Sequence, residues 1–470
     1  MDDTAIVILA AGLGTRMKSR HAKVLHRAGG RALIEHVLEA VLEVVPPQQI
    51  VVVTGCQAEA VESLVRDRGV RFARQQEPRG TGHAVMAARD ATAGAKRVAV
   101  LYGDCPLLTA ETLRRLIAHQ AASDAAAVLL TTFLDDPTGY GRILRDPDGR
   151  IVEIVEEKSA TEEQRAIREI NAGFYCFAAA ALWEHIREIR PDNAAGEYYL
   201  TDLVKILRQA GKMVLPLPHD NSQELLGINT RAELAAADRI LRERIARRLM
   251  LEGVTIEKPE TVTIDPEVRI GMDTVIGPFA QILGRSVIGE NCRVGACAIL
   301  EDAQLEDDVA VEPFSVVRNA RLERGAQVGP FARLRQHAHL APGARVGNFV
   351  ELKNTSLGAG ARALHLAYLG DATVGQDVNI GAGTITCNFD GYTKHPTHIA
   401  ARAFIGSNAT LVAPVEIGEE SYVGAGSVIT DDVPPGALAL GRARQVNKPG
   451  WVEKRKRERA AEKRRSESPL

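Results

Sequence analysis

Aromatic residues are scarce in this chain of 470 residues: Phe, Trp and Tyr together make up only 4% of it, beside 41 glycines. Because a chain of this length has a large core to fill, we expect small aliphatic side chains to fill that core in a repetitive arrangement. Hydrophobic residues make up 45% and charged residues 25% of the sequence. This ordinary balance excludes a mainly disordered chain, and the length suggests about three units, or two domains and a linker.

The sequence also lacks a membrane segment, a secretory signal and a cysteine framework. No run approaches the roughly 20 apolar residues of a membrane helix, and the acidic N-terminus leads straight into a strand-like segment. The net charge of −2 gives no indication of a nucleic-acid partner. We expect a cytoplasmic protein without nucleic-acid or integral membrane partners. Its six scattered cysteines, with no CxxC pair, favour buried thiols in a reducing compartment over disulfides or zinc: Cys56, Cys105, Cys176, Cys292, Cys297 and Cys387.

Aliphatic residues recur every six positions between residues 264 and 429, with a few short slips. A period of six matches neither an α-helix nor an alternating strand. It fits a coil of three short strands that stacks on the next coil at the strand spacing of about 4.8 Å. A β-sandwich with regular turns is the alternative, but it would not keep this phase for so long. The first repeats begin at Ile264, Ile270, Ile276, Ile282, Ile288, Val294 and Leu300.

This hexapeptide pattern resembles that of acyltransferases, and the resemblance implies a left-handed parallel β-helix. The largest break in phase follows Ile380, because the next clear repeat residue is Ile399. Seven extra residues around 388–394 are therefore expected to leave the coil as a loop. Loops on a rigid scaffold often carry function.

The first half of the chain follows a different pattern. Apolar runs alternate with helical patterns, which predicts an α/β domain with a largely parallel, Rossmann-like sheet. A stretch without Gly or Pro places Leu234, Leu241, Ile245 and Leu249 on one face and predicts a single linking helix. The last twenty residues hold eight Lys or Arg against four Glu. The expected segments are 1–229 as the α/β domain, 230–253 as a linker helix, 254–445 as the β-helix and 446–470 as a basic, mostly disordered tail.

A glycine-rich turn, AAGLGTRM, follows the first predicted strand. Small residues let backbone N–H groups approach a phosphate chain, and Arg16 and Lys23 add positive charge for a polyphosphate. The turn is neither a Walker loop nor a dinucleotide fingerprint, because both spacings fail. Together with Lys23 it resembles the signature of sugar nucleotidyltransferases.

Three further segments of the first half agree with nucleotide chemistry. Residues 75–84 form a polar, glycine-rich rim suited to reading a base edge. Asp104 ends a buried strand, where open α/β sheets bind ligands. Without the other motifs, Asp104 could equally be interpreted as a residue that caps the next helix. Asn229 offers a second hard oxygen for Mg²⁺, although a lone Asn is most often a turn residue.

Together these motifs, from residue 4 to about 450, resemble the family of bifunctional bacterial N-acetylglucosamine-1-phosphate uridyltransferases/glucosamine-1-phosphate acetyltransferases. The resemblance implies acetyl transfer from acetyl-CoA to glucosamine 1-phosphate, then uridyl transfer from UTP with release of pyrophosphate. The product, UDP-N-acetylglucosamine, supplies peptidoglycan and lipopolysaccharide precursors.

For uridyl transfer, the resemblance implies Mg²⁺ held by Asp104 and Asn229. Arg16 and Lys23 would neutralise the departing pyrophosphate. No general base is needed, because the attacking phosphate oxygen is already anionic. The segment 196–202 fits the family pattern beside the sugar. The implied contacts of UTP and the sugar nucleotide are Leu9, Ala10, Ala11, Gly12, Lys23, Gln75, Gly80, Thr81, Tyr102, Gly103, Asp104, Gly141, Glu156, Asn171 and Asn229.

Polar residues of the predicted β-helix suggest a second site. Stacked coils would bring Arg335, Lys353 and Lys394 together to hold a phosphate, joined by the Tyr368 hydroxyl. His365 is the candidate general base, because imidazole titrates near neutrality. Glu351 is expected to orient His365, and Asn388 to bind the attacking amine. Cys387 is the rival nucleophile, although no base lies beside it in the sequence.

The resemblance assigns these residues to acetyl transfer by direct attack of the sugar amine on the thioester. It adds Asn379 to the glucosamine 1-phosphate site, and it implies a homotrimer in which acetyl-CoA binds partly across a subunit boundary. At three places the sequence departs from the family pattern. Phe389 stands where many relatives have Tyr. Gln336-His337 replaces the usual Pro-Gly, and Ala400-Ala401 replaces the usual Gly-Asp. The implied acetyl-CoA contacts are Ala382, Asn388, Phe389, Ser407, Ala425 and Arg442.

Two other functions fit parts of the pattern. One is a nucleotidyltransferase for another sugar, such as glucose 1-phosphate, carrying a hexapeptide domain. The other makes the β-helix a trimerisation scaffold without activity. The combination of HLAY and ITCNFDG in this sequence favours the bifunctional enzyme over both.

Overall fold

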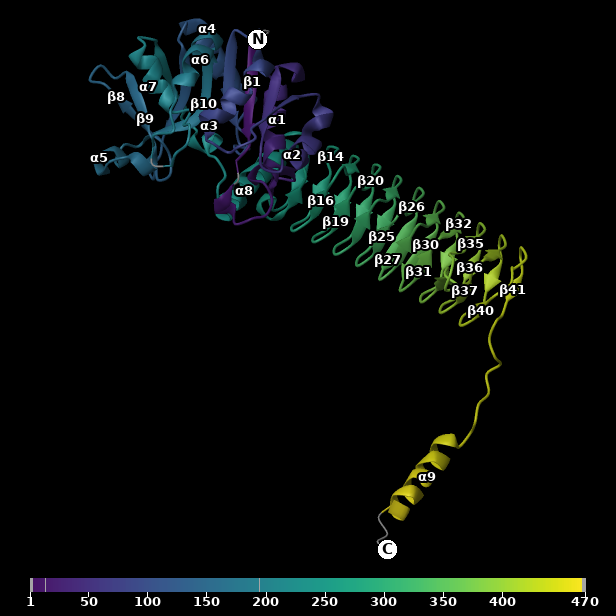
Figure 1. The fold of residues 1–470 in the computed structure, drawn as a ribbon. Helices are drawn as coiled ribbons and strands as arrows, with labels where there is room; N and C mark the ends of the chain where they lie inside the picture. Colours follow the sequence, from purple (N-terminus) through teal and green to yellow (C-terminus); the bar gives the residue numbers. More distant parts are fainter. Residues whose placement is uncertain (1–2, 13, 194, 467–470) are drawn as a thin grey trace. The chain divides into compact units, whose positions relative to one another are not determined.

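The computed structural model describes residues 3–12, 14–193 and 195–466, which fall into two compact units (Figure 1). The first unit comprises residues up to 248 together with 264–266. The second comprises residues 249–263 and those from 267 onward.

The first unit is an α/β domain, which confirms the predicted fold class. The main path of its sheet has the order β11-β7-β10-β6-β1-β4-β5. Strand pairing is parallel except at β10, which runs antiparallel to both β6 and β7. The strands on this path are β1 (Thr4–Ala10), β4 (Ile50–Thr54), β5 (Arg71–Arg74), β6 (Arg97–Tyr102), β7 (Ala127–Phe133), β10 (Glu169–Ala178) and β11 (Val214–Pro218).

Both faces of this sheet are buried. Alternate residues of β1 enter opposite cores: Ile6 and Ile8 pack on one side, Val7 and Leu9 on the other. Coverage on both faces explains why the central strands are continuous apolar runs. A small hairpin, β8 (Arg142–Arg145) and β9 (Ile151–Val155), pairs with β10. The helices on one face are α1 (Leu33–Leu42), α2 (Ala58–Val65) and α4 (Ala110–Ser123), and those on the other are α3 (Thr81–Ala87), α6 (Ala179–His185) and α7 (Asp202–Gln209).

Helix α8 (Arg231–Leu251) lies where the sequence predicts a linking helix. Its Ala237 and Leu241 are buried against Ala28 and Leu33 of the first unit. The boundary between the two units falls inside this helix, after residue 248. Most of α8 therefore belongs to the first unit.

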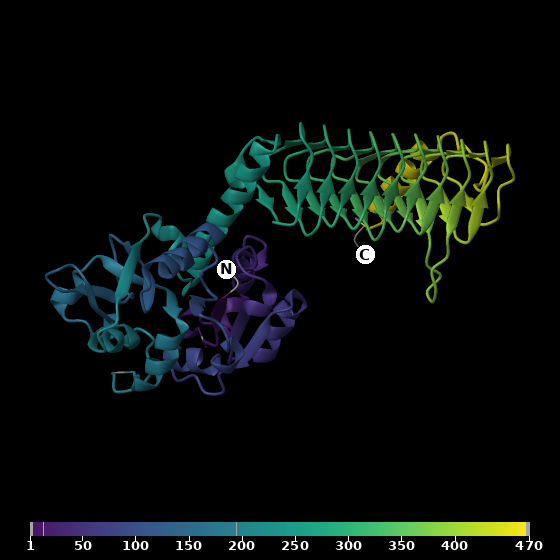
Figure 2. The same ribbon diagram turned by 90° about the horizontal axis from the view of Figure 1, so that it is seen from above.

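The second unit is a three-sided parallel β-helix, as the six-residue period predicts. Its three sheets run from β12 (Thr255–Ile256) to β41 (Leu438–Ala439), from β13 (Thr263–Ile264) to β40 (Val428–Ile429) and from β14 (Arg269–Ile270) to β38 (Val415–Ile417). Neighbouring coils stack in register, as in the pair of Ile282 with Leu300, and Figure 2 shows the successive coils side by side. The repeat residues point inward and are buried, which confirms the left-handed β-helix that the hexapeptide pattern implied.

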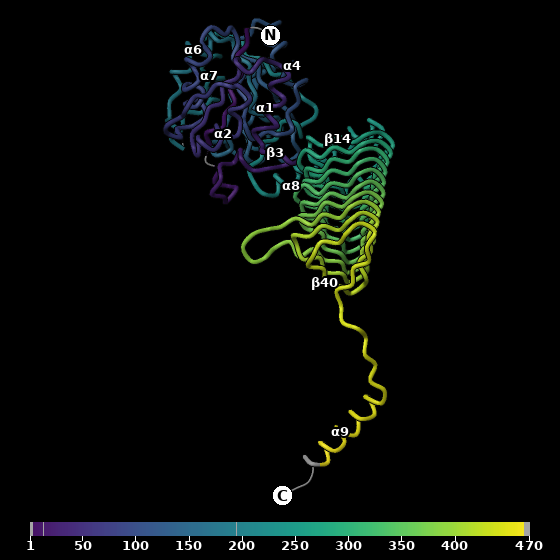
Figure 3. Tube along the Cα trace, turned by 90° about the vertical axis from the view of Figure 1, so that its right-hand side faces the viewer, coloured from purple at the N-terminus to yellow at the C-terminus, as the bar shows by residue number. Residues whose placement is uncertain are grey.

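The expected loop leaves the coil between β34 (Ile385–Cys387) and β35 (Thr397–Ile399). It projects clearly from the stack in Figure 3. Asp390 organises it by accepting hydrogen bonds from the backbone N–H groups of Tyr392 (2.8 Å) and Thr393 (2.7 Å). These bonds and the neighbouring His395 lower the pKa of Asp390.

The C-terminal segment differs from the prediction of a disordered tail. Residues Trp451–Ser466 form helix α9. The side chains described there, up to residue 464, are exposed, so no packing requires this helix. Its Ala, Glu, Lys and Arg residues have high helix propensity, and local preference explains the helix despite the charge.

Candidate active sites

The first candidate site lies at the edge of the sheet where β1 and β6 end. Arg16 Nη2 donates a hydrogen bond of 2.8 Å to Asn229 Oδ1, and Lys23 Nζ donates one of 3.0 Å to the same oxygen. Lys23 also forms a salt bridge with the carboxylate of Asp104. Asp104 is held by its backbone, because its carbonyl accepts from the N–H of Ile228 at 2.9 Å. Four of the predicted residues therefore meet at one place.

This arrangement fits a magnesium ion. The carboxylate of Asp104 and the amide oxygen of Asn229 converge on one cation, the Lys23 ammonium. Both are hard oxygen ligands of the kind that Mg²⁺ takes in ones and twos beside phosphates and water. Within residues 3–12, 14–193 and 195–466, no cluster of three or more His, Cys, Asp or Glu could hold a metal.

The glycine-rich turn leaves room at this edge. A Cβ built on Gly12 would meet nothing within 4 Å, so ligand atoms can approach the backbone there. Leu9 and Ala10 end β1 and Ala11 follows it, and all three are buried. The N–H of Gly103 donates to the carbonyl of Leu9 at 2.9 Å, which aligns the ends of the two strands.

The predicted base-reading segment folds against residues 197–200. The N–H of Gly82 donates to the carbonyl of Tyr198 at 2.7 Å, and the N–H of Leu200 donates to Thr81 Oγ1 at 3.0 Å. Gly80 has φ of +108°, and a Cβ there would lie 2.6 Å from the Tyr198 carbonyl oxygen. Only glycine fits at this position, and its carbonyl accepts a 3.0 Å hydrogen bond from Gln75 Nε2.

The predicted sugar residues gather around the β8–β10 region. Glu156 Oε1 accepts from Thr201 Oγ1 at 3.0 Å, and burial raises the pKa of Glu156. The N–H of Asn171 donates to the carbonyl of Gly141 at 2.9 Å, while its side chain donates to Tyr175 Oη at 2.7 Å. The segment 196–202 therefore contacts both the sugar region, through Thr201, and the base segment.

Tyr102, the last residue of β6, packs its ring against Gly173 of β10. A Cβ on Gly173 would lie 2.3 Å from the Tyr102 ring, so the ring packs directly on bare backbone. Burial, and then the nearby Glu156, raise the pKa of the Tyr102 hydroxyl. The phenol is therefore neutral at physiological pH.

The second candidate site lies on the β-helix, where β25 (Arg333–Arg335), β28 (Glu351–Lys353) and β31 (Tyr368–Gly370) run side by side. Arg335 Nε donates to Glu351 Oε1 at 2.7 Å. In strand register, Arg335 stands opposite Lys353 and Glu351 opposite Tyr368. The stacked coils thus bring together the residues predicted for phosphate binding.

Asp371 is the residue around which the rest of this site is arranged. Its carboxylate accepts from Lys353 Nζ at 2.9 Å and from the side-chain amides of Asn354 and Asn388. Burial opposes ionisation, but these hydrogen bonds lower the pKa of Asp371. The carboxylate is therefore ionised and keeps Lys353 in place.

Lys394 of the extruded loop reaches the same place. Its amine lies close enough to Lys353 that this interaction, together with Asp371, raises the pKa of Lys353. The same contact lowers the pKa of Lys394. An anion bound beside these two basic groups would favour the charged form of both.

Gly370 leaves room for this cluster. A Cβ on Gly370 would lie 2.5 Å from Tyr368 Oη and 2.7 Å from Asn388 Nδ2. The phenol, predicted to join the phosphate site, and the amide, predicted to bind the attacking amine, therefore both lie above bare backbone.

His365 has a different partner from the one predicted. Its Nδ1 lies 2.8 Å from Oδ1 of Asn348, its opposite residue in the register of β27 (Arg345–Asn348) and β30 (Arg362–His365). Glu351, expected to orient His365, instead bonds Arg335, because it lies on another sheet of the β-helix. The amide oxygen can only accept, so Nδ1 carries the proton and the lone pair lies on Nε2.

The predicted acetyl-CoA residues divide into a row, two exposed outliers and Asn388, which bonds Asp371 as described above. The N–H of Asn408 donates to the carbonyl of Ala382 at 2.7 Å, and the N–H of Gly426 donates to that of Ser407 at 2.8 Å. Ala382, Ser407 and Ala425 thus lie at one corner of consecutive coils. Asn379 lies on the adjoining strand, β33 (Asn379–Ile380). The outliers are Phe389, 59% exposed in the loop, and Arg442, exposed after β41.

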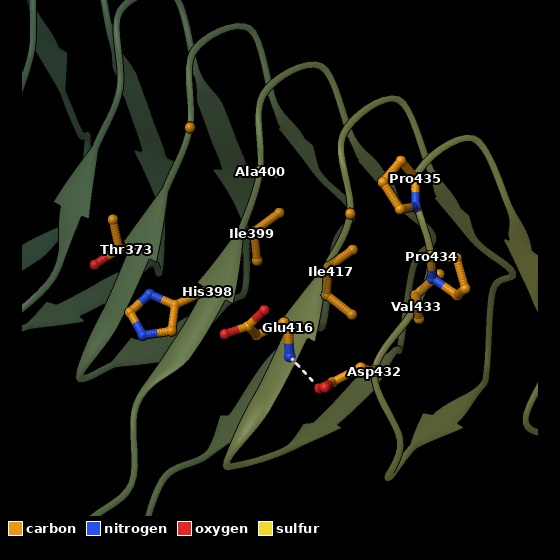
Figure 4. Close-up of a pocket in the computed structure, with 12 residues that line it drawn as sticks. Thr373, His398, Ile399, Ala400, Glu416, Ile417, Asp432, Val433, Pro434 and Pro435 are labelled. Atoms are coloured by element: carbon orange, nitrogen blue, oxygen red, sulfur yellow. Dashed lines mark hydrogen bonds between the residues drawn. The ribbon is translucent and has the colours of Figure 1, made fainter.

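A groove of about 550 Å³ crosses a third face of the β-helix (Figure 4). Thr373, His398 and Glu416 stand in register along it, and the N–H of Glu416 donates to Asp432 Oδ1 at 2.8 Å. None of the predicted substrate residues lines this groove. It is therefore separate from the acetyl-transfer site.

Several residues of the two sites were missed by sequence reasoning. Asp371, Asn348 and Thr201 are polar residues inside or beside the quoted motifs, and only their contacts give them a role. Asp371 directly follows the YLG of the predicted phosphate site. A prediction of strand register from Lys353 to the next coil would have placed Asp371 beside Lys353.

The folds and sites define a nucleotidyltransferase domain joined to a hexapeptide-repeat transferase domain, and comparison with known families agrees. Residues 6–250 match the MobA-like NTP transferase domain. Residues 267–302 and 396–431 match the bacterial transferase hexapeptide family of six repeats.

Relatives over the whole chain are proteins called bifunctional protein GlmU. The one from Solibacter usitatus is 58% identical over 96% of this chain and 97% of its own length. Those from Koribacter versatilis and an Anaeromyxobacter species are 46% and 51% identical, over 98% and 97% of this chain and 98% and 93% of theirs. The chain belongs to the bifunctional GlmU family, which confirms the family that its motifs resemble.

Proposed function

We propose a division of two reactions between the two parts of the chain. As a member of the GlmU family, the chain is a bifunctional uridyltransferase and acetyltransferase of UDP-N-acetylglucosamine synthesis. Residues 1–229 carry the uridyl-transfer residues and residues 254–445 the acetyl-transfer residues, with 230–253 as the connection. The tail, 446–470, belongs to neither site.

For uridyl transfer, Arg16 and Lys23 bind the phosphates of UTP. A phosphate oxygen of N-acetylglucosamine 1-phosphate attacks the α-phosphorus, and the bond to pyrophosphate breaks. Asp104 and Asn229 would hold Mg²⁺, which supplies charge neutralisation when bound. The observation that carries this assignment is the convergence of Arg16 and Lys23 on Asn229, with Asp104 paired to Lys23.

The rest of the first site supplies recognition. Gln75 reads the uracil together with Ala11, Gly80 and Thr81. Its side-chain amide is buried and is held in one orientation by its hydrogen bond to Gly80, which supports this role. Gly141, Glu156 and Asn171 contact the sugar. The remaining lining is supplied by Leu9, Ala10, Gly12, Tyr102 and Gly103.

For acetyl transfer, Arg335, Lys353 and Lys394 bind the phosphate of glucosamine 1-phosphate, with Tyr368 and Asn379 beside them. The sugar amine attacks the thioester carbonyl of acetyl-CoA while His365 Nε2 takes the amine proton, and the carbon–sulfur bond breaks to release CoA. The partner that holds the His365 ring for this step is Asn348. Glu351 instead positions Arg335.

Acetyl-CoA binds along the corner row of Ala382, Ser407 and Ala425, with Asn388, Phe389 and Arg442 from outside the row. The exposed positions of Phe389 and Arg442 support a site completed by a second copy of the chain, in a homotrimer. Six free cysteines support a reducing, cytoplasmic location. Over the described ranges, no helix is both long and apolar enough to cross a membrane.

One assay tests the proposed function against its two alternatives. The full-length chain should release CoA with glucosamine 1-phosphate and acetyl-CoA, and pyrophosphate with N-acetylglucosamine 1-phosphate, UTP and Mg²⁺. A preference for glucose 1-phosphate with ATP or dTTP would contradict the substrate. Absence of CoA release would favour a scaffold, and a monomer with full acetyltransferase activity would contradict the trimer.

A further inference from the structure

Gln75 has no amide proton left with which to read a base. The residue follows β5 and is only 6% exposed. Its Nε2 donates to the carbonyl of Gly80 at 3.0 Å, and the same nitrogen lies 3.0 Å from Nδ1 of His83. A primary amide has two N–H bonds, so both are used.

The orientation of this amide follows from its partners. A backbone carbonyl can only accept, so the amide nitrogen, and not the oxygen, must face Gly80. His83 Nδ1 faces the same nitrogen and must therefore also accept. His83 thus carries its proton on Nε2, and Gln75 turns only its Oε1 away from these two partners.

His83 is itself held in position. It lies on α3, whose first turn is tied to residues 198–200 by the Gly82 and Thr81 hydrogen bonds described above. Its ring lies 6.1 Å from the ring of Tyr198, centroid to centroid. The imidazole is therefore a rigid acceptor for the Gln75 amide.

We propose that His83 is a positioning residue for nucleotide selectivity: it fixes the Gln75 amide so that only an acceptor faces the base. Uracil presents an N3–H donor to such an acceptor, whereas cytosine presents a bare N3 lone pair. An amide free to rotate could turn its nitrogen toward cytosine. The proposal rests on the role of Gln75 as the residue that reads the base.

The test compares UTP with CTP in the full-length enzyme and its His83→Leu variant. The ratio of kcat/KM for UTP to that for CTP should fall about five- to tenfold, the factor that one ordinary hydrogen bond represents. The change should appear mainly in KM for UTP. His83→Asn should recover most of the ratio, because its Oδ1 can accept from Gln75 in place of Nδ1.

Controls separate this proposal from the site on which it rests. Acetyl transfer by the same sample should be unchanged, and kcat with UTP should stay near that of the parent, which shows that the first unit is folded. An unchanged ratio in His83→Leu, or a loss of kcat for both nucleotides that His83→Asn does not rescue, would overturn the role of His83. If Gln75→Leu left the ratio intact, the role of Gln75 itself would be wrong.

Discussion

Arg16 and Asn229 lie 213 residues apart in the chain and are joined by a hydrogen bond of 2.8 Å. The first follows the glycine-rich turn after β1, and the second lies just before α8. The bond therefore brings the two ends of the nucleotidyltransferase unit to one edge of the sheet. Asp104, at the end of β6, completes this edge through Lys23.

Replacing Asp104 by Ala should abolish most uridyl transfer and leave acetyl transfer unchanged. The variant lacks the one carboxylate proposed for Mg²⁺, so we expect a loss of about a thousandfold or more. Both reactions should be measured on one sample. The exposed Asp67→Ala is the matched control, and an equal loss of both activities in Asp104→Ala would point to misfolding.

Replacing His365 by Ala should lower acetyl transfer by about 10² to 10⁴-fold, the usual contribution of a positioned base. Uridyl transfer should be preserved, because His365 is exposed and lies in the other unit. His339→Ala, with the same loss of an imidazole on the β-helix, should behave like the parent.

Replacing Cys387 by Ala distinguishes direct transfer from an acyl-enzyme. Direct attack by the sugar amine requires no thiol, so the variant should keep acetyl transfer within about twofold of the parent. Mass spectrometry after incubation with acetyl-CoA alone should find no acetylated protein. An inactive variant, or a trapped acetyl group on the parent, would make Cys387 the nucleophile.

Replacing Glu156 by Gln should stabilise the first unit at neutral pH while weakening sugar binding. Burial raises the pKa of Glu156, so its ionisation favours unfolding. This penalty is absent below the ordinary Glu pKa of about 4.3 and develops as pH rises through the higher pKa of the folded state. Gln removes the penalty and keeps an acceptor for Thr201.

Urea unfolding followed by Trp183 fluorescence measures this effect. The gain in stability of Glu156→Gln should be present at pH 7 and should vanish near pH 4, and KM for N-acetylglucosamine 1-phosphate should rise. The exposed Glu43→Gln is the control. A gain that does not change with pH would show that burial of the charge is not its cause.

Fragments of the first unit should differ in stability according to whether they contain α8. Residues 1–251 should keep uridyl transfer, and residues 1–229 should be less stable because Ala28 and Leu33 lose contact with Ala237 and Leu241. Burial of a Leu side chain contributes roughly 1.5–3 kcal/mol. Equal unfolding free energies in urea would show that α8 is only a connector, and an inactive but folded 1–251 would contradict the assignment of uridyl transfer.

The β-helix and the glycine-rich turn could be predicted because their causes are local. Each coil repeats one short pattern in which an inward aliphatic residue is followed by a corner, so a period of six is visible without any long-range information. The turn after β1 requires small residues next to one another, and Arg16 and Lys23 follow within a few positions. The extruded loop could be predicted for the same reason, because it interrupts the six-residue period.

The partners of the site residues depended on contacts between distant segments. Strand register places Asn348 opposite His365, and Glu351 forms its hydrogen bond with Arg335 instead. No spacing in the sequence distinguishes these pairs. Asp371 gains its role because the next coil brings it to Lys353. The sequence by itself determined the two folds and, through its motifs, the family with its two reactions, since these follow from local patterns; its site residues are predictions. Only the tertiary structure decided which side chains pair and which way the Gln75 amide points, because hydrogen-bond partners are chosen by packing in three dimensions.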